Sequence, residues 1–255
     1  MEPGSSSSAR GRVHVDPGRK RVRTYVGGIA IADTTRPLLV WENPAYPAYY
    51  IPIADVRTDL LAPTATTTHS PSRGDAQHFT VKANGEERVD SAWQYPQSPI
   101  EELRDCIRFD WNAMDAWFEE DEEVYVHPRS PYARIDILPT SRAVRIEVDG
   151  VVLATSTHAH VLHETGLPPR WYLPKVDVRM DLLVPTDHTT RCPYKGFAEY
   201  WSARVGERLE ENVAWSYRTP LPESIRVAGM IAFYDERVDV VVDGERQERP
   251  VTKFS

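Results

Sequence analysis

The chain contains the stretch Thr189-Thr190-Arg191-Cys192-Pro193-Tyr194-Lys195-Gly196, which has a counterpart in the first half, Thr67-Thr68-His69-Ser70-Pro71-Ser72-Arg73-Gly74. The two stretches share the Thr-Thr pair, the proline and the glycine, and 189 minus 67 gives an offset of 122 positions. The same offset relates Glu42 to Glu164, Tyr50 to Tyr172 and Trp93 to Trp215. An ungapped register of this length indicates duplicated structure. The sequence therefore predicts two tandem repeats that meet near Tyr132.

Both repeats show the pattern of β-strands joined by tight turns. Residues 21–26 alternate polar and apolar side chains before the Gly27-Gly28 turn, and residues 144–148 do the same before the turn at Asp149-Gly150. The pattern predicts a mainly β protein built from two tandem repeats of a small antiparallel β domain. We place a disordered tail at residues 1–11, the first repeat at 12–132 and the second repeat at 133–255.

Three further segments give predictions of local structure. Residues 55–61 and 177–183 follow a proline and carry an acidic residue early, which favours one or two helical turns that end before Pro63 and Pro185; a strand is the alternative. In the first repeat, Trp111, Met114 and Trp117 are spaced three apart, which predicts a helical insertion within residues 100–117. Residues 229–234 and 238–242 predict a final hairpin.

An acidic run, residues 119–123, follows the predicted insertion. Runs of like charge are typical of a solvated face or loop, and a cation site is the less favoured interpretation.

Composition excludes several classes of protein. The formal net charge of −8 opposes binding to nucleic acid and to anionic membranes. The only two cysteines, Cys106 and Cys192, are too few for a disulfide framework or an all-cysteine zinc site. The first eleven residues are rich in serine and lack the apolar run of a secretory signal. We expect a cytoplasmic protein that needs no cofactor or metal and has a small-molecule ligand.

The second repeat resembles a known family. The residues that carry the likeness are the Cys192-Pro193-Tyr194-Lys195-Gly196 run, Glu164-Thr165-Gly166-Leu167-Pro168, Trp171-Tyr172-Leu173-Pro174 and Gly229-Met230-Ile231-Ala232-Phe233-Tyr234. They are similar to the family of domain of unknown function 427, which is also labelled nucleotidyltransferase-like, and the whole chain resembles its longer, two-domain members. The resemblance implies a compact β-rich domain of the β-tent kind. Relatives of that kind bind zinc through four cysteines, which this chain lacks.

The candidate site lies in the second repeat. Cations beside Cys192 favour its thiolate, and a desolvated Lys195 suits proton transfer or imine formation, with Glu164 as the opposed carboxylate. We therefore predict acid–base or covalent chemistry on a small organic acid or carbonyl compound. The expected catalytic residues are Lys195, Cys192, Tyr194 and Glu164, and the expected substrate-binding residues are Tyr172, Thr190, Arg191, Trp201, Trp215 and Tyr217.

The same residues also have purely structural, non-catalytic interpretations. Cys192 is as well explained as a small packed hydrophobe, Lys195 as an exposed residue, and the Lys195–Glu164 combination as a plain salt bridge. A non-catalytic binding module, whose first repeat supplies a surface for a homodimer or another partner, is the main alternative. Nucleotidyl transfer is a third, although no phosphate-binding loop is present and Asp177 and Asp181 fit a helix start and a surface ion pair better than metal ligands. The histidines at 158, 160, 163 and 188 lack ligand spacing and are interpreted as ordinary polar residues.

Overall fold

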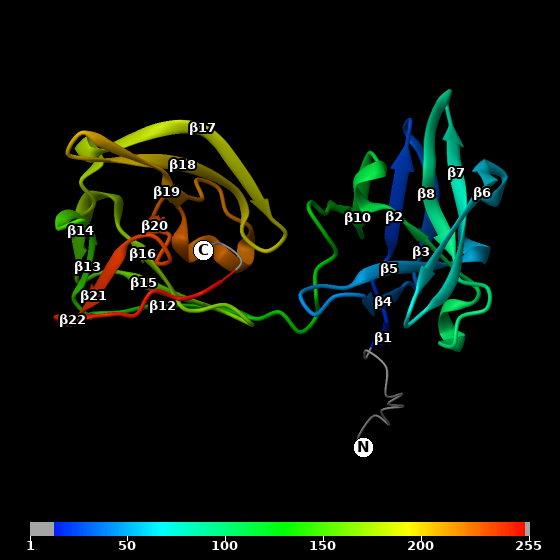
Figure 1. Cartoon of the computed structure of the whole chain (residues 1–255), viewed down its shortest axis with the longest axis horizontal. Helices are drawn as coiled ribbons and strands as arrows, with labels where there is room; N and C mark the ends of the chain where they lie inside the picture. The colour runs from blue at the N-terminus through cyan, green and yellow to red at the C-terminus, as the bar shows by residue number, and fades with distance from the viewer. Residues whose placement is uncertain (1–12, 253–255) are drawn as a thin grey trace, which may run out of the picture. The chain divides into compact units, whose positions relative to one another are not determined.

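The computed structural model describes residues 13–252, so the predicted tail lies outside the described part. The chain divides into two compact units, Met1–Ser130 and Pro131–Ser255, each of which is mostly β (Figure 1). This confirms the predicted fold class. Within residues 13–252, no helix is long and apolar enough to cross a membrane.

The first repeat contains a seven-stranded and a four-stranded antiparallel sheet. The strand order is β1-β4-β5-β9-β8-β7-β6 in the larger sheet and β11-β10-β2-β3 in the smaller one. The strands are β1 (His14–Pro17), β2 (Val22–Val26), β3 (Ile29–Thr34), β4 (Leu38–Trp41), β5 (Ala48–Pro52), β6 (Leu61–Ser70), β7 (Gly74–Ala83), β8 (Glu86–Gln94), β9 (Cys106–Phe109), β10 (Ala116–Glu119) and β11 (Glu122–Glu123).

The second repeat has the same topology strand for strand. Its sheets run β12-β15-β16-β20-β19-β18-β17 and β14-β13-β21-β22. The strands are β12 (Ile135–Pro139), β13 (Val144–Val148), β14 (Val151–Ser156), β15 (His160–Glu164), β16 (Arg170–Leu173), β17 (Leu183–Cys192), β18 (Gly196–Val205), β19 (Arg208–Ser216), β20 (Ile231–Phe233), β21 (Asp239–Val242) and β22 (Glu245–Arg246). The duplication seen in the sequence is thus a duplication of the whole fold.

The predicted helices at residues 55–61 and 177–183 are wrong in extent. The structure has single 3-10 turns there, namely η1 (Ile53–Asp55), η2 (Thr58–Leu60), η5 (Lys175–Asp177) and η6 (Met180–Leu182). The prolines do not end these segments, because Pro63 and Pro185 lie inside β6 and β17, each followed by a register shift. Both strands are edges of their sheets, where a residue without an N–H is tolerated.

The predicted helical insertion at residues 100–117 is also wrong. The segment forms η3 (Glu101–Leu103), β9, η4 (Trp111–Ala113) and the start of β10, and β9 to β11 occupy the same places in their sheets as β20 to β22. The rings of Trp111 and Trp117 stack, with centroids 4.8 Å apart and planes 2° apart. The three-residue spacing of these side chains arises because η4 and β10 both contribute rings to one core. The predicted final hairpin fails as well, since β20 and β21 belong to different sheets.

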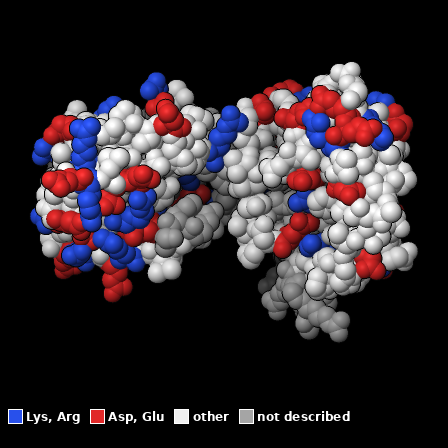
Figure 2. All heavy atoms as spheres, turned by 45° about the horizontal axis from the view of Figure 1, so that its top comes forward, with Lys and Arg blue, Asp and Glu red and all other residues white. Residues whose placement is uncertain are grey.

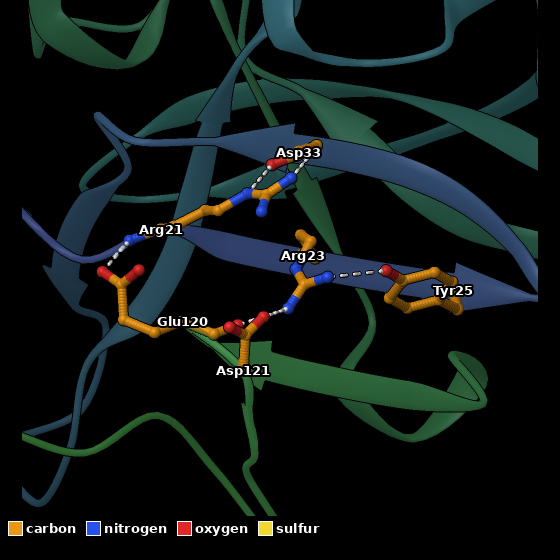
Figure 3. Close-up of polar contacts among 6 residues, drawn as sticks. All are labelled: Arg21, Arg23, Tyr25, Asp33, Glu120 and Asp121. Atoms are coloured by element: carbon orange, nitrogen blue, oxygen red, sulfur yellow. Dashed lines mark hydrogen bonds and ion pairs between the residues drawn. The ribbon is translucent and has the colours of Figure 1, made fainter.

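The acidic run forms the β10–β11 turn and pairs with its own repeat. Asp121 accepts a hydrogen bond from Arg23 of β2 at 2.8 Å, and the Glu120 carboxylate accepts one from the Arg21 backbone N–H at 2.8 Å (Figure 3). Arg21 also bonds Asp33 of β3. Glu119 is buried and pairs with Lys20. These acids therefore anchor the smaller sheet.

Apolar side chains pack on both faces of the second repeat's larger sheet. Trp171 and Leu173 join a large cluster that includes Ile146 and Val240 of the smaller sheet. Tyr172, which points the other way because side chains alternate along a strand, joins a second cluster with Tyr200, Trp215 and Tyr217. The 3-10 segment η7 (Pro222–Val227) contributes Val227 to this second cluster. The candidate site is built around it.

Candidate functional site

The signature stretch forms the β17–β18 hairpin. Cys192 ends β17 and pairs with Gly196, the first residue of β18, so Pro193, Tyr194 and Lys195 form the turn. Gly196 has a φ of +92° and its counterpart Gly74 a φ of +90°, a conformation that side chains disfavour. The glycine therefore lets the chain reverse and directs Lys195 toward β15.

Lys195 and Glu164 form an ion pair that is almost removed from water. The Lys195 ammonium donates a hydrogen bond to the Glu164 carboxylate at the end of β15. The two side chains are only 11 % and 13 % exposed. The interpretation of Lys195 as an exposed strand-edge residue is thus wrong, while the salt bridge itself is present.

Two buried phenols, Tyr172 and Tyr217, interact electrostatically with the carboxylate of this pair. The Tyr172 hydroxyl accepts a hydrogen bond from the Trp215 indole N–H at 3.3 Å. Burial raises the pKa of Tyr172 and of Tyr217 well above the usual value, so both stay neutral phenols at physiological pH. The free, half-buried Cys192 interacts electrostatically with both, as does Glu164. Three predicted site residues, Tyr172, Trp215 and Tyr217, therefore belong to one cluster. Glu164 and Cys192 interact with its phenols, and Lys195 is bonded to Glu164.

The first repeat has a related arrangement. Glu42 accepts a hydrogen bond from Tyr50 at 2.7 Å and lies 3.9 Å from Arg73 and 3.4 Å from Arg108. Arg73 also packs its guanidinium over the ring of Tyr95 at 5.5 Å. Both repeats thus hold a cation from the signature turn against a carboxylate beside buried tyrosines.

A hollow of about 220 Å³ lies on another side of the aromatic cluster. It is lined by His188, Tyr200, Asn212, Tyr234 and Arg237. The Tyr200 hydroxyl connects to Thr190 at 2.9 Å and to the Tyr234 hydroxyl at 3.2 Å. None of the four predicted catalytic residues lines this hollow. The sequence-based prediction missed its lining; the available signal was that Thr66, His78 and Asp90 occupy the positions of His188, Tyr200 and Asn212 in the first repeat.

The other predicted binding residues lie apart. Trp201 packs against the large core cluster on the opposite face of β18, with the Lys175 ammonium 5.9 Å from its ring. Arg191 is exposed. Tyr194 is half-buried, and its backbone carbonyl accepts a hydrogen bond from Ser224 at 3.3 Å. The structure therefore does not bring these three to the hollow.

A buried ion triad backs the aromatic cluster. Arg170 donates two 3.0 Å hydrogen bonds to Glu236, lies 3.3 Å from Asp235 and packs 5.4 Å from the ring of Trp215. Burial raises the pKa of Asp235 to about 6 despite the nearby guanidinium. Although burial opposes it, hydrogen bonds from Arg170 and Thr252 hold the pKa of Glu236 below its usual range. The guanidinium is thus fixed by one bidentate carboxylate and one that is readily protonated.

The acids near η5 and η6 have protein partners. Asp177 accepts a hydrogen bond from Ser156 at 2.6 Å, and Asp181 forms a 2.6 Å ion pair with Arg179, as predicted. Over residues 13–252, no three His, Cys, Asp or Glu side chains form a group suited to a metal ion.

Comparisons with known proteins place the chain. A search of curated proteins finds none with significant similarity. The family model described as "Domain of unknown function (DUF427)" matches twice, over residues 14–120 and 136–244. The two matches follow the two repeats and together cover most of the sequence, so the chain belongs to the DUF427 family as a tandem, two-domain member.

Proposed function

We propose that the second repeat binds a small organic acid in the hollow lined by His188, Tyr200, Asn212, Tyr234 and Arg237. The observation that carries this proposal is the chemistry of the lining, which offers a guanidinium, an amide and phenol hydroxyls but no carboxylate. Arg237 has its nearest acid, Glu210, 4.0 Å away. A guanidinium together with neutral donors is the usual recognition set for a carboxylate.

The side-chain amide of Asn212 is only partly hydrogen-bonded within the protein. Its Oδ1 accepts a hydrogen bond from Thr186 at 2.7 Å. Its Nδ2 has no hydrogen-bond partner in the described part of the chain. The φ of Asn212 is +50°, in the left-handed region that asparagine tolerates. The backbone therefore holds an available donor in the lining.

The first repeat supports this assignment by contrast. Asp90 replaces Asn212 there with a similar φ of +52°. Both of its carboxylate oxygens accept hydrogen bonds from threonine hydroxyls, from Thr64 at 2.6 Å and from Thr66 at 2.8 Å. The equivalent position in the first repeat thus carries a carboxylate whose two oxygens already have hydrogen-bond donors within the same repeat.

The hollow is small and open to solvent on one side. About 220 Å³ is smaller than the several hundred Å³ of pockets for drug-sized molecules, so an acid of a few carbons fits best. On the face shown in Figure 2, basic and acidic side chains of the second repeat are interspersed rather than gathered into one basic field. A compact anion therefore suits this repeat better than an extended polyanion.

Titration calorimetry of the full chain with acetate, pyruvate and succinate tests the proposal. We expect at least one acid to bind, and Asn212→Asp and Arg237→Met each to weaken binding about tenfold or more, as the loss of a charge-assisted contact implies. Arg179→Met, which removes an exposed arginine away from the hollow, is the matched control. Binding that survives both lining variants would refute the assignment.

The Lys195–Glu164 pair supports a second candidate, acid–base or covalent chemistry on such an acid or on a carbonyl compound. The favouring observation is that Lys195 and Glu164 form an ion pair with little access to water, and that Tyr172 interacts electrostatically with both Glu164 and Cys192. Lys195→Arg copies Arg73 of the first repeat and removes the readily titrated amine while keeping the ion pair. If a substrate is turned over, this variant should fold normally and lose turnover; full activity in it would exclude Lys195 as the catalytic residue.

A further inference from the structure

The first repeat contains a hollow of its own at a different place in the fold. It has a volume of about 190 Å³. Its lining includes the aromatic rings of Tyr46, Tyr49, Trp111, Trp117 and His127 and the charged side chains of Glu42, Arg108 and Asp110. The rings of Tyr46 and His127 stack at 3.9 Å with planes 9° apart, so one wall is flat.

The corresponding place in the second repeat is filled by the Arg170 triad. Arg170 occupies the position of Ala48, and, counted from the paired phenylalanines Phe109 and Phe233, Asp235 and Glu236 occupy the positions of Trp111 and Asn112. The first repeat thus has alanine, tryptophan and asparagine where the second has a guanidinium and two carboxylates. The exchange leaves room where the triad would lie.

A guanidinium is nevertheless kept over the equivalent tryptophan. Arg108 packs 4.7 Å from the ring of Trp93, as Arg170 packs 5.4 Å from that of Trp215. It comes from β9, the strand next to β5. Both repeats therefore have an arginine against the tryptophan, but from different strands, and the first repeat lacks the counterparts of Asp235 and Glu236.

Arg108 is poorly matched by the remaining acids. It reaches Glu42 only at 3.4 Å, and Glu42 is shared with Arg73 and with the hydroxyl of Tyr50. Its Nη1 donates a hydrogen bond to the Phe109 backbone carbonyl, and its buried Nε has no hydrogen-bond partner among residues 13–252. Asp110 accepts a hydrogen bond from the Asn112 backbone N–H at 3.1 Å. Among residues 13–252, Glu42 is thus the one carboxylate that pairs with Arg108, and it is already shared, while Arg108 lines the hollow.

We infer that this hollow binds a small aromatic carboxylic acid whose carboxylate pairs with Arg108. The carboxylate takes the role that Glu236 plays toward Arg170, and the ring packs against the flat aromatic walls. The site is separate from the hollow of the second repeat and does not depend on the function proposed for it.

The test uses the full chain with benzoate, benzylamine and benzyl alcohol as probes. The indole N–H signals of the tryptophans are followed by NMR, with Trp111→Phe to assign the reporter. We expect benzoate to shift the signals of Trp111 and Trp117 and to bind at least tenfold more tightly than the amine or the alcohol. Arg108→Met should weaken benzoate binding at least tenfold.

A second variant keeps the test decisive if Arg108→Met does not fold. Asn112 is exposed, and Asn112→Glu places a carboxylate at the position of Glu236. This internal acid should compete with benzoate and also weaken binding at least tenfold. Asn212→Asp in the second repeat should leave the Trp111 response unchanged. The inference is overturned if benzylamine binds as well as benzoate, if benzoate leaves both signals unmoved, or if Asn112→Glu does not affect binding.

Discussion

At the scale of single residues, the buried Lys195–Glu164 pair decides how the signature turn is held. Both charges have little access to water, so removing either one leaves the other buried without a partner, which is strongly destabilising. Arg73 and Glu42 keep the same combination of charges in the first repeat at a longer distance, 3.9 Å. The pair is thus part of the fold whether or not it also serves chemistry.

Lys195→Met should lower the free energy of unfolding by about 3 kcal/mol, because it leaves the Glu164 carboxylate buried without its cation. The double variant Lys195→Met with Glu164→Gln should recover much of that loss. Urea denaturation followed by fluorescence measures both. A single variant as stable as the unmodified protein would contradict the assigned pair.

Asp235 should make the second repeat more stable in mild acid. Because burial raises its folded pKa to about 6, the folded state binds the proton more tightly than the unfolded state, and this contribution is lost as the pH rises from about 4 through 6. Asp235→Asn should therefore increase the free energy of unfolding at pH 7, by up to about 3 kcal/mol at 1.4 kcal/mol per pKa unit. Below pH 4 the difference should vanish.

Glu236→Gln is the matched control for that prediction. The pKa of Glu236 is lowered, so its charged form contributes stability above the unfolded pKa, and neutralising it should destabilise the protein at pH 7. Denaturation curves between pH 4 and 8 separate the two variants. Equal responses of both would show that the two carboxylates do not differ as described.

At the scale of elements, the signature hairpin depends on its glycine. An added Cβ at Gly196 would meet its nearest atoms at 3.5 Å or more, so a clash is not the difficulty. The difficulty is the backbone angle φ of +92°, because holding an alanine in that conformation costs about 1–3 kcal/mol. Gly196→Ala and Gly74→Ala should each destabilise the chain by this amount in equilibrium unfolding. No loss in either variant would remove the conformational reason for the glycine.

Hairpins were predictable from the sequence because their signals are local. The turns at Gly27-Gly28 and Asp149-Gly150 join alternating segments, and both hairpins are present. The spacing of Trp111, Met114 and Trp117 predicts a helix wrongly, because residues from a 3-10 turn and a strand can show a helical interval by chance. Periodicity over so few residues does not record which sheet receives each side chain.

The candidate site was predictable only in part. The sequence predicts a carboxylate, Glu164, near Lys195, and the two form an ion pair. The sequence does not predict the hollow of the second repeat. Its lining combines Asn212 of β19, Arg237 beyond β20 and His188, which lies at the register shift in β17. No spacing in the sequence encodes that meeting.

At the scale of the whole molecule, the two repeats share one topology and differ in which internal space is filled. The second repeat fills one place with Arg170, Asp235 and Glu236 and has a hollow beside Asn212. The first repeat has a hollow beside Arg108 and carries Asp90, bonded to two threonines, at the position of Asn212. Duplication followed by exchange of a few side chains accounts for both. The account thus predicts two sites with different acids as ligands.

The most direct test of the acid site in the second repeat is the NMR signal of the Asn212 side-chain amide, assigned with Asn212→Asp. As the acid that binds most tightly in calorimetry is titrated, the Nδ2 protons should shift along a saturable curve that matches the calorimetric affinity, and Arg237→Met should flatten that curve. Saturable binding that leaves the Asn212 amide unmoved would contradict the account.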